Sequence, residues 1–120
     1  MILVDTSVWI DHLRAGDEHL IDLLDSSQVL AHPFIIGELA CGNLRNRDEV
    51  LRLLSDLPQA PLASHEEVLY FIESKKLMGL GVGYIDTHLL ASTALADTAL
   101  IWTRDQRLQK TARKLQLASS

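Results

Sequence analysis

The hydrophobic positions of this chain fall into two kinds of segment that alternate along its length. The first kind is a short run of adjacent aliphatic or β-branched residues, bounded by polar or turn-forming residues, which is typical of buried strands. The runs at residues 60–62 and 117–118 predict only brief strands. The first of these contains a proline, which favours a position at the edge of a sheet. The predicted strands are residues 2–4, 29–31, 60–62, 99–103 and 117–118.

In the second kind of segment, apolar residues recur every three or four positions, which indicates amphipathic helices. Local signals support these helices: Pro33 suits a first helical turn, and Ser64 with Glu67 has the spacing of a capping box. The glycines of residues 79–83 are expected to turn the chain tightly before the next helix. The predicted helices are residues 8–13, 17–24, 34–41, 47–57, 65–79, 85–96 and 105–115.

Short strands that alternate with helices predict βα units around a parallel sheet. Neither an internal repeat nor a linker divides the chain. We therefore expect one domain over residues 1–120 with an α/β fold, in which three α/β/α layers contain a short parallel sheet of four to five strands flanked by helices.

The composition is that of a globular protein. The chain has 120 residues, of which 48% are hydrophobic and 22% are charged, and these values exclude a disordered tail, a collagen-like rod and a low-complexity linker. A carboxylate interrupts the first apolar run, so we expect no signal peptide, and no run is long enough for a membrane span. Cys41 is the single cysteine, which leaves no disulfide within the chain. A cytoplasmic protein is expected.

The charge is unevenly distributed. The formal net charge of −5 argues against a general nucleic-acid coat protein, but residues 101–120 carry five bases and one acid. An acidic body with a basic C-terminal segment is compatible with a protein that handles a polyanion through a metal-filled acidic site. Within that segment Arg107, Lys110 and Lys114 share one helical stripe, which is either a solvated face or a track for phosphates; the sequence leaves both readings open.

Two acids are predicted to meet although 100 positions separate them. Asp5 follows the first strand directly, and Asp105 lies two residues after the strand that ends at Thr103. The carboxyl ends of parallel strands open onto one edge of a sheet, where ligands bind at a switch in strand order. Both carboxylates should therefore project at that edge.

Two further acids lie on predicted helical stripes that should face the core. Glu38 shares a stripe with Phe34 and Ile35, and Asp86 shares one with Leu89. A carboxylate in such a position is costly unless it is paired or bound to a metal. The alternatives are that Glu38 turns out to solvent and that Asp86 only starts a helix.

Together the four acids predict a metal site made of oxygen ligands. Carboxylates and water are the ligands that Mg²⁺ and Mn²⁺ prefer, and four carboxylates leave room for two ions. Without metal, the mutual repulsion of the four should raise the pKa of at least one. Zinc is disfavoured because none of the five histidines takes the paired spacing of a zinc site.

The residues around these acids resemble the signature of the PIN-domain family. The segments that carry the resemblance are Asp5-Thr6-Ser7, Glu38 in the third helix, Gly83-Tyr84-Ile85-Asp86 with Leu89-Leu90-Ala91, and Thr103-Arg104-Asp105. The chain length and the third of these segments resemble the toxin branch, the VapC-like ribonucleases of toxin–antitoxin pairs. The resemblance covers the whole chain, and its one departure is Leu108, where many relatives carry an aromatic residue.

The resemblance implies a PIN-like fold and an Mg²⁺- or Mn²⁺-dependent endoribonuclease that acts as a toxin. Its catalytic, metal-holding acids would be Asp5, Glu38, Asp86 and Asp105. Thr6 and Thr103 would support these acids through their hydroxyls, and the partners would be RNA, a cognate antitoxin and a second copy of the chain. Arg104, between Thr103 and Asp105, is expected to touch the substrate or to neutralise the acids.

The sequence leaves one other class of protein open and argues against two more. An inactive PIN-like protein that acts as a protein-binding regulatory module remains the alternative. A receiver domain needs adjacent acids after the first strand and a lysine after the last, and a phosphatase of similar topology needs Asp-x-Asp where this chain has Asp5-Thr6-Ser7. Neither pattern is present.

Overall fold

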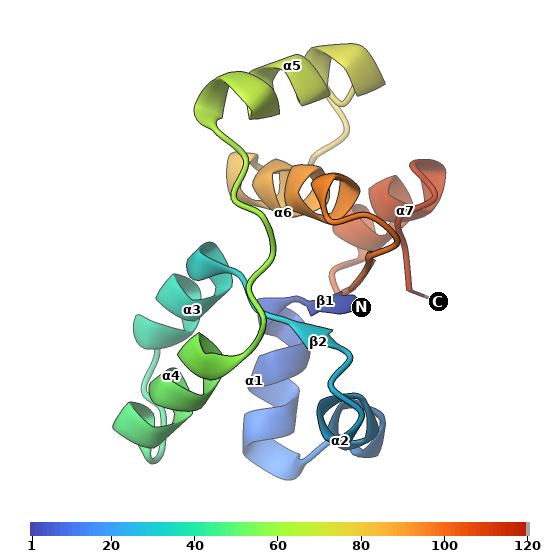
Figure 1. Ribbon diagram of the computed structural model, residues 1–120. Coiled ribbons are helices and arrows are strands. Elements are labelled where there is room, and N and C mark those ends of the chain that lie inside the picture. Colours follow the sequence, from blue (N-terminus) through green and yellow to red (C-terminus); the bar gives the residue numbers. More distant parts are fainter. Residues whose placement is uncertain (120) are drawn as a thin grey trace.

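The centre of the molecule is a parallel sheet with the strand order β2-β1-β3 (Figure 1). A computed structural model describes residues 1–119. Its strands are β1 (Ile2–Val4), β2 (Val29–Leu30) and β3 (Leu100–Trp102). In the register of β1 with β3, Val4 is the partner of Trp102, and the N–H of Asp5 donates to the carbonyl oxygen of Trp102 at 2.9 Å. Asp5 thus leaves the sheet beside Thr103.

Helices cover both faces of this sheet. In Figure 1, α1 and α2 lie on one side, α6 lies on the other, and α5 is stacked on α6 away from the strands. The three-layer α/β/α fold predicted from the sequence is therefore confirmed. The helices are α1 (Thr6–Ala15), α2 (Glu18–Asp25), α3 (Pro33–Ala40), α4 (Arg47–Asp56), α5 (His65–Lys75), α6 (Tyr84–Leu95) and α7 (Gln106–Lys114).

The prediction of four to five strands was wrong, because the sheet has three strands within residues 1–119. The predicted run at residues 117–118 contributes one isolated bridge, Ile101 with Ala118, and beside the run at residues 60–62 the bridge to Ala31 is made by the preceding residue, Gln59. Pro61 has no N–H to donate, so the segment at residues 60–62 cannot continue a ladder.

The local signals in the sequence act as expected around α5. The Ser64 hydroxyl accepts from the N–H of Glu67 at 3.1 Å, and the Glu67 carboxylate accepts from the N–H of Ser64 at 2.8 Å, which completes the capping box. The helix stops at Lys75, earlier than predicted, because Lys76 adopts a left-handed conformation with φ of 54°. Gly79 and Gly81, with φ of 76° and 78°, then turn the chain tightly as predicted.

The central helix α6 is surrounded by protein. Residues 87–93 are all buried, because α6 packs between the sheet and α5, and Leu89 and Leu90 have no exposed surface. Four of these seven residues are polar, and they need partners inside the protein. The Ser92 hydroxyl finds one in Nε2 of His32, at 3.0 Å.

His32 fixes α3 against α6. It lies directly before α3, and its Nδ1 accepts from the N–H of Phe34 at 3.0 Å, which caps the helix. Burial, helped by nearby His88, lowers the pKa of His32 to about 4, so the ring is neutral at physiological pH and Nε2 carries the proton donated to Ser92. The two helices that carry Glu38 and Asp86 are thereby held together.

The capping box yields a prediction about stability. Ser64→Ala should lower the free energy of unfolding by about 0.5–2 kcal/mol, because two N–H groups at the start of α5 lose their organised partners. The measurement is urea unfolding followed by circular dichroism. Ser74→Ala is the matched control, since Ser74 is exposed on the same helix. Equal losses in the two variants would contradict a specific role for the cap.

Candidate active site

Two hydroxyl groups join the end of β1 to the end of β3. The Thr103 hydroxyl donates to Oδ2 of Asp5 at 2.7 Å, and the Ser7 hydroxyl donates to the same oxygen at 2.8 Å. Each hydroxyl also accepts from a backbone N–H, Thr103 from Asp105 and Ser7 from Arg104, both at 3.0 Å. Asp5 is only 7% exposed, so these contacts fix its carboxylate at the edge of the sheet.

Asp105 lies at the same edge and starts α7. Its Oδ1 accepts from the N–H of Leu108 at 2.9 Å, which caps the helix and fixes the carboxylate. The meeting of the strand ends that carry Asp5 and Asp105, predicted from topology, is confirmed by the pairing of β1 with β3.

Glu38 reaches this edge from α3, but not from the buried face of that helix. The expectation that it faces the core was wrong: α3 buries Ile35 and Leu39, and Glu38 lies beside them on the exposed side. Its Oε1 accepts from the Thr6 hydroxyl at 2.8 Å. The carboxylate is therefore solvated and anchored to the first turn of α1, directly after Asp5.

Asp86, in the first turn of α6, completes the group. Burial raises the pKa of Asp86 to about 6, and repulsion from Asp5, Asp105 and Glu38 adds to the rise. The expected raised pKa in the cluster is thus found at the half-buried member. Asp5, Glu38, Asp86 and Asp105 are called the four-acid site below.

The donor set of the four-acid site fits a hard divalent cation. Asp5, Glu38 and Asp105 each use one carboxylate oxygen in a hydrogen bond and have another oxygen with no protein donor among residues 1–119. Hydrogen bonds of this kind orient carboxylates for a metal. In that same part of the chain, no three such side chains already form a ready-made ligand shell. The four acids therefore influence one another through their charges, but their oxygens do not yet surround one common metal position.

Arg104 does not join the four-acid site through its side chain. Its guanidinium pairs with Asp11 and, at 2.6 Å, with Asp17, and it lies over the ring of Trp102 at 5.7 Å. The expectation that Arg104 neutralises the four acids was wrong, because two nearer carboxylates take its charge. Its backbone contributes instead, through the N–H that donates to Ser7.

Sequence reasoning missed Ser7 as a site residue. Its hydroxyl lies between Asp5 and the N–H of Arg104, so it supports the first acid as directly as Thr103 does. The available signal was the run of three polar residues, Asp5-Thr6-Ser7, at the end of a predicted strand. The hydroxyls of Thr6 and Thr103 each donate to one of the four acids, and their supporting role in the site stays a prediction.

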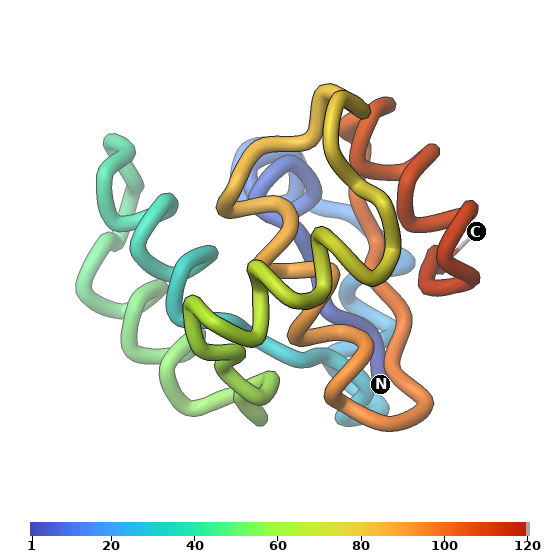
Figure 2. The backbone as a smooth tube through the Cα atoms, turned by 90° about the horizontal axis from the view of Figure 1, so that it is seen from above, coloured from blue at the N-terminus to red at the C-terminus, as the bar shows by residue number. Residues whose placement is uncertain are grey.

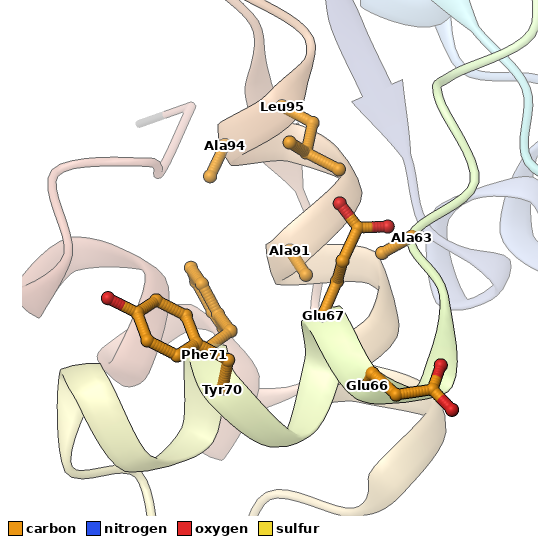
Figure 3. Close-up of a pocket in the computed structure, with 8 residues that line it drawn as sticks. All are labelled: Ala63, Glu66, Glu67, Tyr70, Phe71, Ala91, Ala94 and Leu95. Atoms are coloured by element: carbon orange, nitrogen blue, oxygen red, sulfur yellow. The ribbon is translucent and has the colours of Figure 1, made fainter.

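A separate apolar hollow of about 380 Å³ lies between α5 and α6 (Figure 3). Its apolar surface is formed mainly by Phe71, Ala91, Ala94 and Leu95. In the close-up, the rings of the aromatic residues stand at one end and two glutamates stand at the other. None of the four acids lines this hollow, so it is distinct from the four-acid site.

The chain belongs to the PIN domain family, whose pattern matches residues 2–114. Among known proteins it is similar to two relatives from strains of Mycobacterium tuberculosis, both named Ribonuclease VapC32. The identity to each is 50% over 109 residues, which is 91% of this chain and 88% of the relative. No helix among residues 1–119 has both the length and the apolar character needed to span a membrane.

The raised pKa of Asp86 yields a prediction about stability. Without divalent metal, Asp86→Asn should melt at a higher temperature than the unsubstituted protein at neutral pH, because it removes one of four repelling charges. The pKa of Asp86 rises from 3.8 to about 6 on folding, so folded Asp86 binds its proton more tightly than unfolded Asp86. The unsubstituted protein therefore loses stability as the pH rises through this window, and the difference should vanish below it.

Saturating Mg²⁺ should reverse the order, because a ligand at about 100 times its Kd adds about 2.7 kcal/mol and the variant has lost a ligand. The measurement is thermal melting of both proteins in EDTA and in MgCl₂. Asp22→Asn, an exposed acid in the middle of α2, controls for the change in net charge. If Asp86→Asn is the less stable protein in EDTA, Asp86 is a helix cap or a paired acid and not part of a repelling cluster.

Proposed function

We propose that this chain is a divalent-metal-dependent endoribonuclease that hydrolyses RNA phosphodiester bonds and acts as the toxin of a toxin–antitoxin pair. The observation that carries the proposal is that one edge of the sheet brings together Asp5, Glu38, Asp86 and Asp105, where burial and then repulsion from the other three acids raise the pKa of Asp86. A cluster of acids that repel one another is costly to keep, and a bound cation removes the cost. Membership of the PIN family and relatives named ribonucleases support RNA as the substrate.

The cation would be Mg²⁺ or Mn²⁺, and the residues that would hold it are Asp5, Glu38, Asp86 and Asp105. The available oxygens are all carboxylate, which suits these hard ions better than zinc. When bound, such a metal polarises the phosphate, lowers the pKa of a bound water and stabilises the leaving oxygen. Four acids are enough for one ion or for two.

The protein's own side chains position the reaction. Ser7 and Thr103 hold the Asp5 carboxylate from one side, and Thr6 holds Glu38, so two of the acids cannot swing away when the anionic substrate arrives. Asp105 is fixed as the cap of α7. Asp86 is half-buried, which restricts water around it and strengthens its interactions with charge. Hydrolysis consumes one water: its oxygen bonds to phosphorus, the bond from phosphorus to the leaving oxygen breaks, and a proton released by the water ends on the leaving oxygen.

We propose two protein partners. A cognate antitoxin would lie over the four-acid site and place a basic residue among the acids, where their charge favours a cation. A second copy of the chain would form a homodimer, and the apolar hollow between α5 and α6, beside Tyr70 with 75% exposure, supports an interface of that kind. Both partners and the RNA substrate would meet the protein in the cytoplasm.

Cleavage of RNA should depend on metal and on Asp5. With structured RNAs as substrate, cleavage should occur in MgCl₂ or MnCl₂ and should stop in EDTA, because the acids alone repel phosphate. Asp5→Asn should cut far more slowly than the unsubstituted protein, with products compared on denaturing gels. Cutting that persists in EDTA, or an Asp5→Asn protein that cuts as fast, would contradict the proposal.

The Ser7 hydroxyl should matter for the metal without mattering for the fold. Ser7→Ala should weaken Mn²⁺ affinity or the cleavage rate by about 10–100-fold, as is common when a group that orients a ligand is lost. Ser7→Thr, which keeps the hydroxyl, is the control. Titration with Mn²⁺ and the melting temperature are both measured, and equal binding by Ser7→Ala and the unsubstituted protein would show that Thr103 alone holds Asp5.

A further inference from the structure

The side chain of Arg107 lies flat against Gly81. A Cβ at residue 81 would stand 3.0 Å from Cδ of Arg107, 3.1 Å from Nη1 and 3.3 Å from Nε. Gly81 also has φ of +78°, a conformation that other residues rarely adopt. The missing side chain therefore makes the space in which the stretched arginine rests.

This contact links the segments that deliver two of the four acids. Arg107 lies two residues after Asp105, in the first turn of α7, and Gly81 lies five residues before Asp86, in the loop that leads into α6. Figure 2 shows this loop beside the red helix α7. The guanidinium is thus held against the loop that leads to Asp86, on the helix that Asp105 starts.

The charge of Arg107 has no partner within the part of the chain that is described, since no carboxylate lies within ion-pair distance of it. Arg104, three residues earlier, has two such partners. Lys110 and Lys114 follow Arg107 on the same exposed side of α7, and the opposite side buries Leu108 and Ala112. A line of unpaired positive charge therefore leads from the four-acid site along α7.

We propose that Arg107 binds a backbone phosphate of the RNA strand next to the bond that is cut, with Lys110 and Lys114 extending this contact along the strand. The inference rests on the proposed ribonuclease function. A guanidinium offers two parallel N–H donors to a phosphate. Because the Arg107 side chain already packs against Gly81, it loses less conformational entropy when it binds the phosphate. In a chain of net charge −5, such a contact offsets the repulsion that the rest of the protein exerts on RNA.

The test measures RNA binding as a function of salt. A labelled single-stranded RNA is titrated in MgCl₂ with the slow Asp5→Asn protein, with and without Arg107→Gln, which keeps the stem over Gly81 and removes the charge. Loss of the contact should weaken binding about tenfold, the usual scale of a charge-assisted hydrogen bond. The slope of log K against log[NaCl] should become shallower by about 0.7, the value for one phosphate on a single strand.

Arg113→Gln is the matched control, because it removes the same charge from an exposed position of α7 that does not contact Gly81. Its slope should stay unchanged, and Arg107→Lys should restore the slope. An unchanged slope in Arg107→Gln, or equal losses of RNA affinity in the two Gln variants, would show that this face of α7 is only a solvated surface and does not bind phosphate. RNA cleavage by the otherwise unsubstituted protein is measured in parallel. If this protein cleaves RNA while Arg107→Gln binds RNA normally, only the proposed role of Arg107 is wrong. If it does not cleave RNA, the proposed ribonuclease function is wrong as well.

Discussion

The parallel pairing of β1 with β3 is the constraint on which the site depends. It places Asp5 beside Thr103, 98 residues away, and the hydrogen bond between their side chains spans 2.7 Å. The same hydroxyl accepts from the N–H of Asp105, so the strand that positions the first acid also fixes the start of α7. A shift of one residue in this register would turn these side chains to opposite faces and separate the two carboxylates.

The other two acids depend on a different contact, deeper in the core. His32 caps α3 and bonds Ser92 of α6, which holds the helix of Glu38 against the helix of Asp86. The result is a half-buried acid among three others: burial raises the pKa of Asp86 to about 6, and repulsion from the other three acids adds to the rise. Proteins keep such strain where function needs it, and the surrounding core compensates. Here the compensating core is aliphatic, built on residues such as Leu89 and Ile101.

Part of this could be predicted from the sequence. Strand ends in parallel sheets meet at one edge, so the convergence of Asp5 and Asp105 followed from the order of elements alone. The exposure of Glu38 could not be read from helical spacing, because α3 buries only a narrow face. Ser7 and the partners of Arg104 were missed for a related reason: their contacts join residues 87 to 97 positions apart, and only the folded chain brings those together. The two predicted strands that did not form show the same limit: the run at residues 117–118 makes a single bridge, and the bridge near residues 60–62 comes from the preceding residue, Gln59.

Arg104 and Arg107 show how neighbours decide what a charge can do. Both are arginines close to Asp105 in the sequence, so they have the same side chain and the same charge. Arg104 meets Asp11 of α1 and Asp17, the residue that caps α2, so its guanidinium ties these helices to the end of β3 and has little charge left for a ligand. Arg107 meets a glycine, which gives it a resting place without neutralising it. An anionic strand that approaches the four acids therefore meets unpaired cations along α7, the helix that Asp105 starts. The basic C-terminal segment of an otherwise acidic chain thus extends away from the site along this helix.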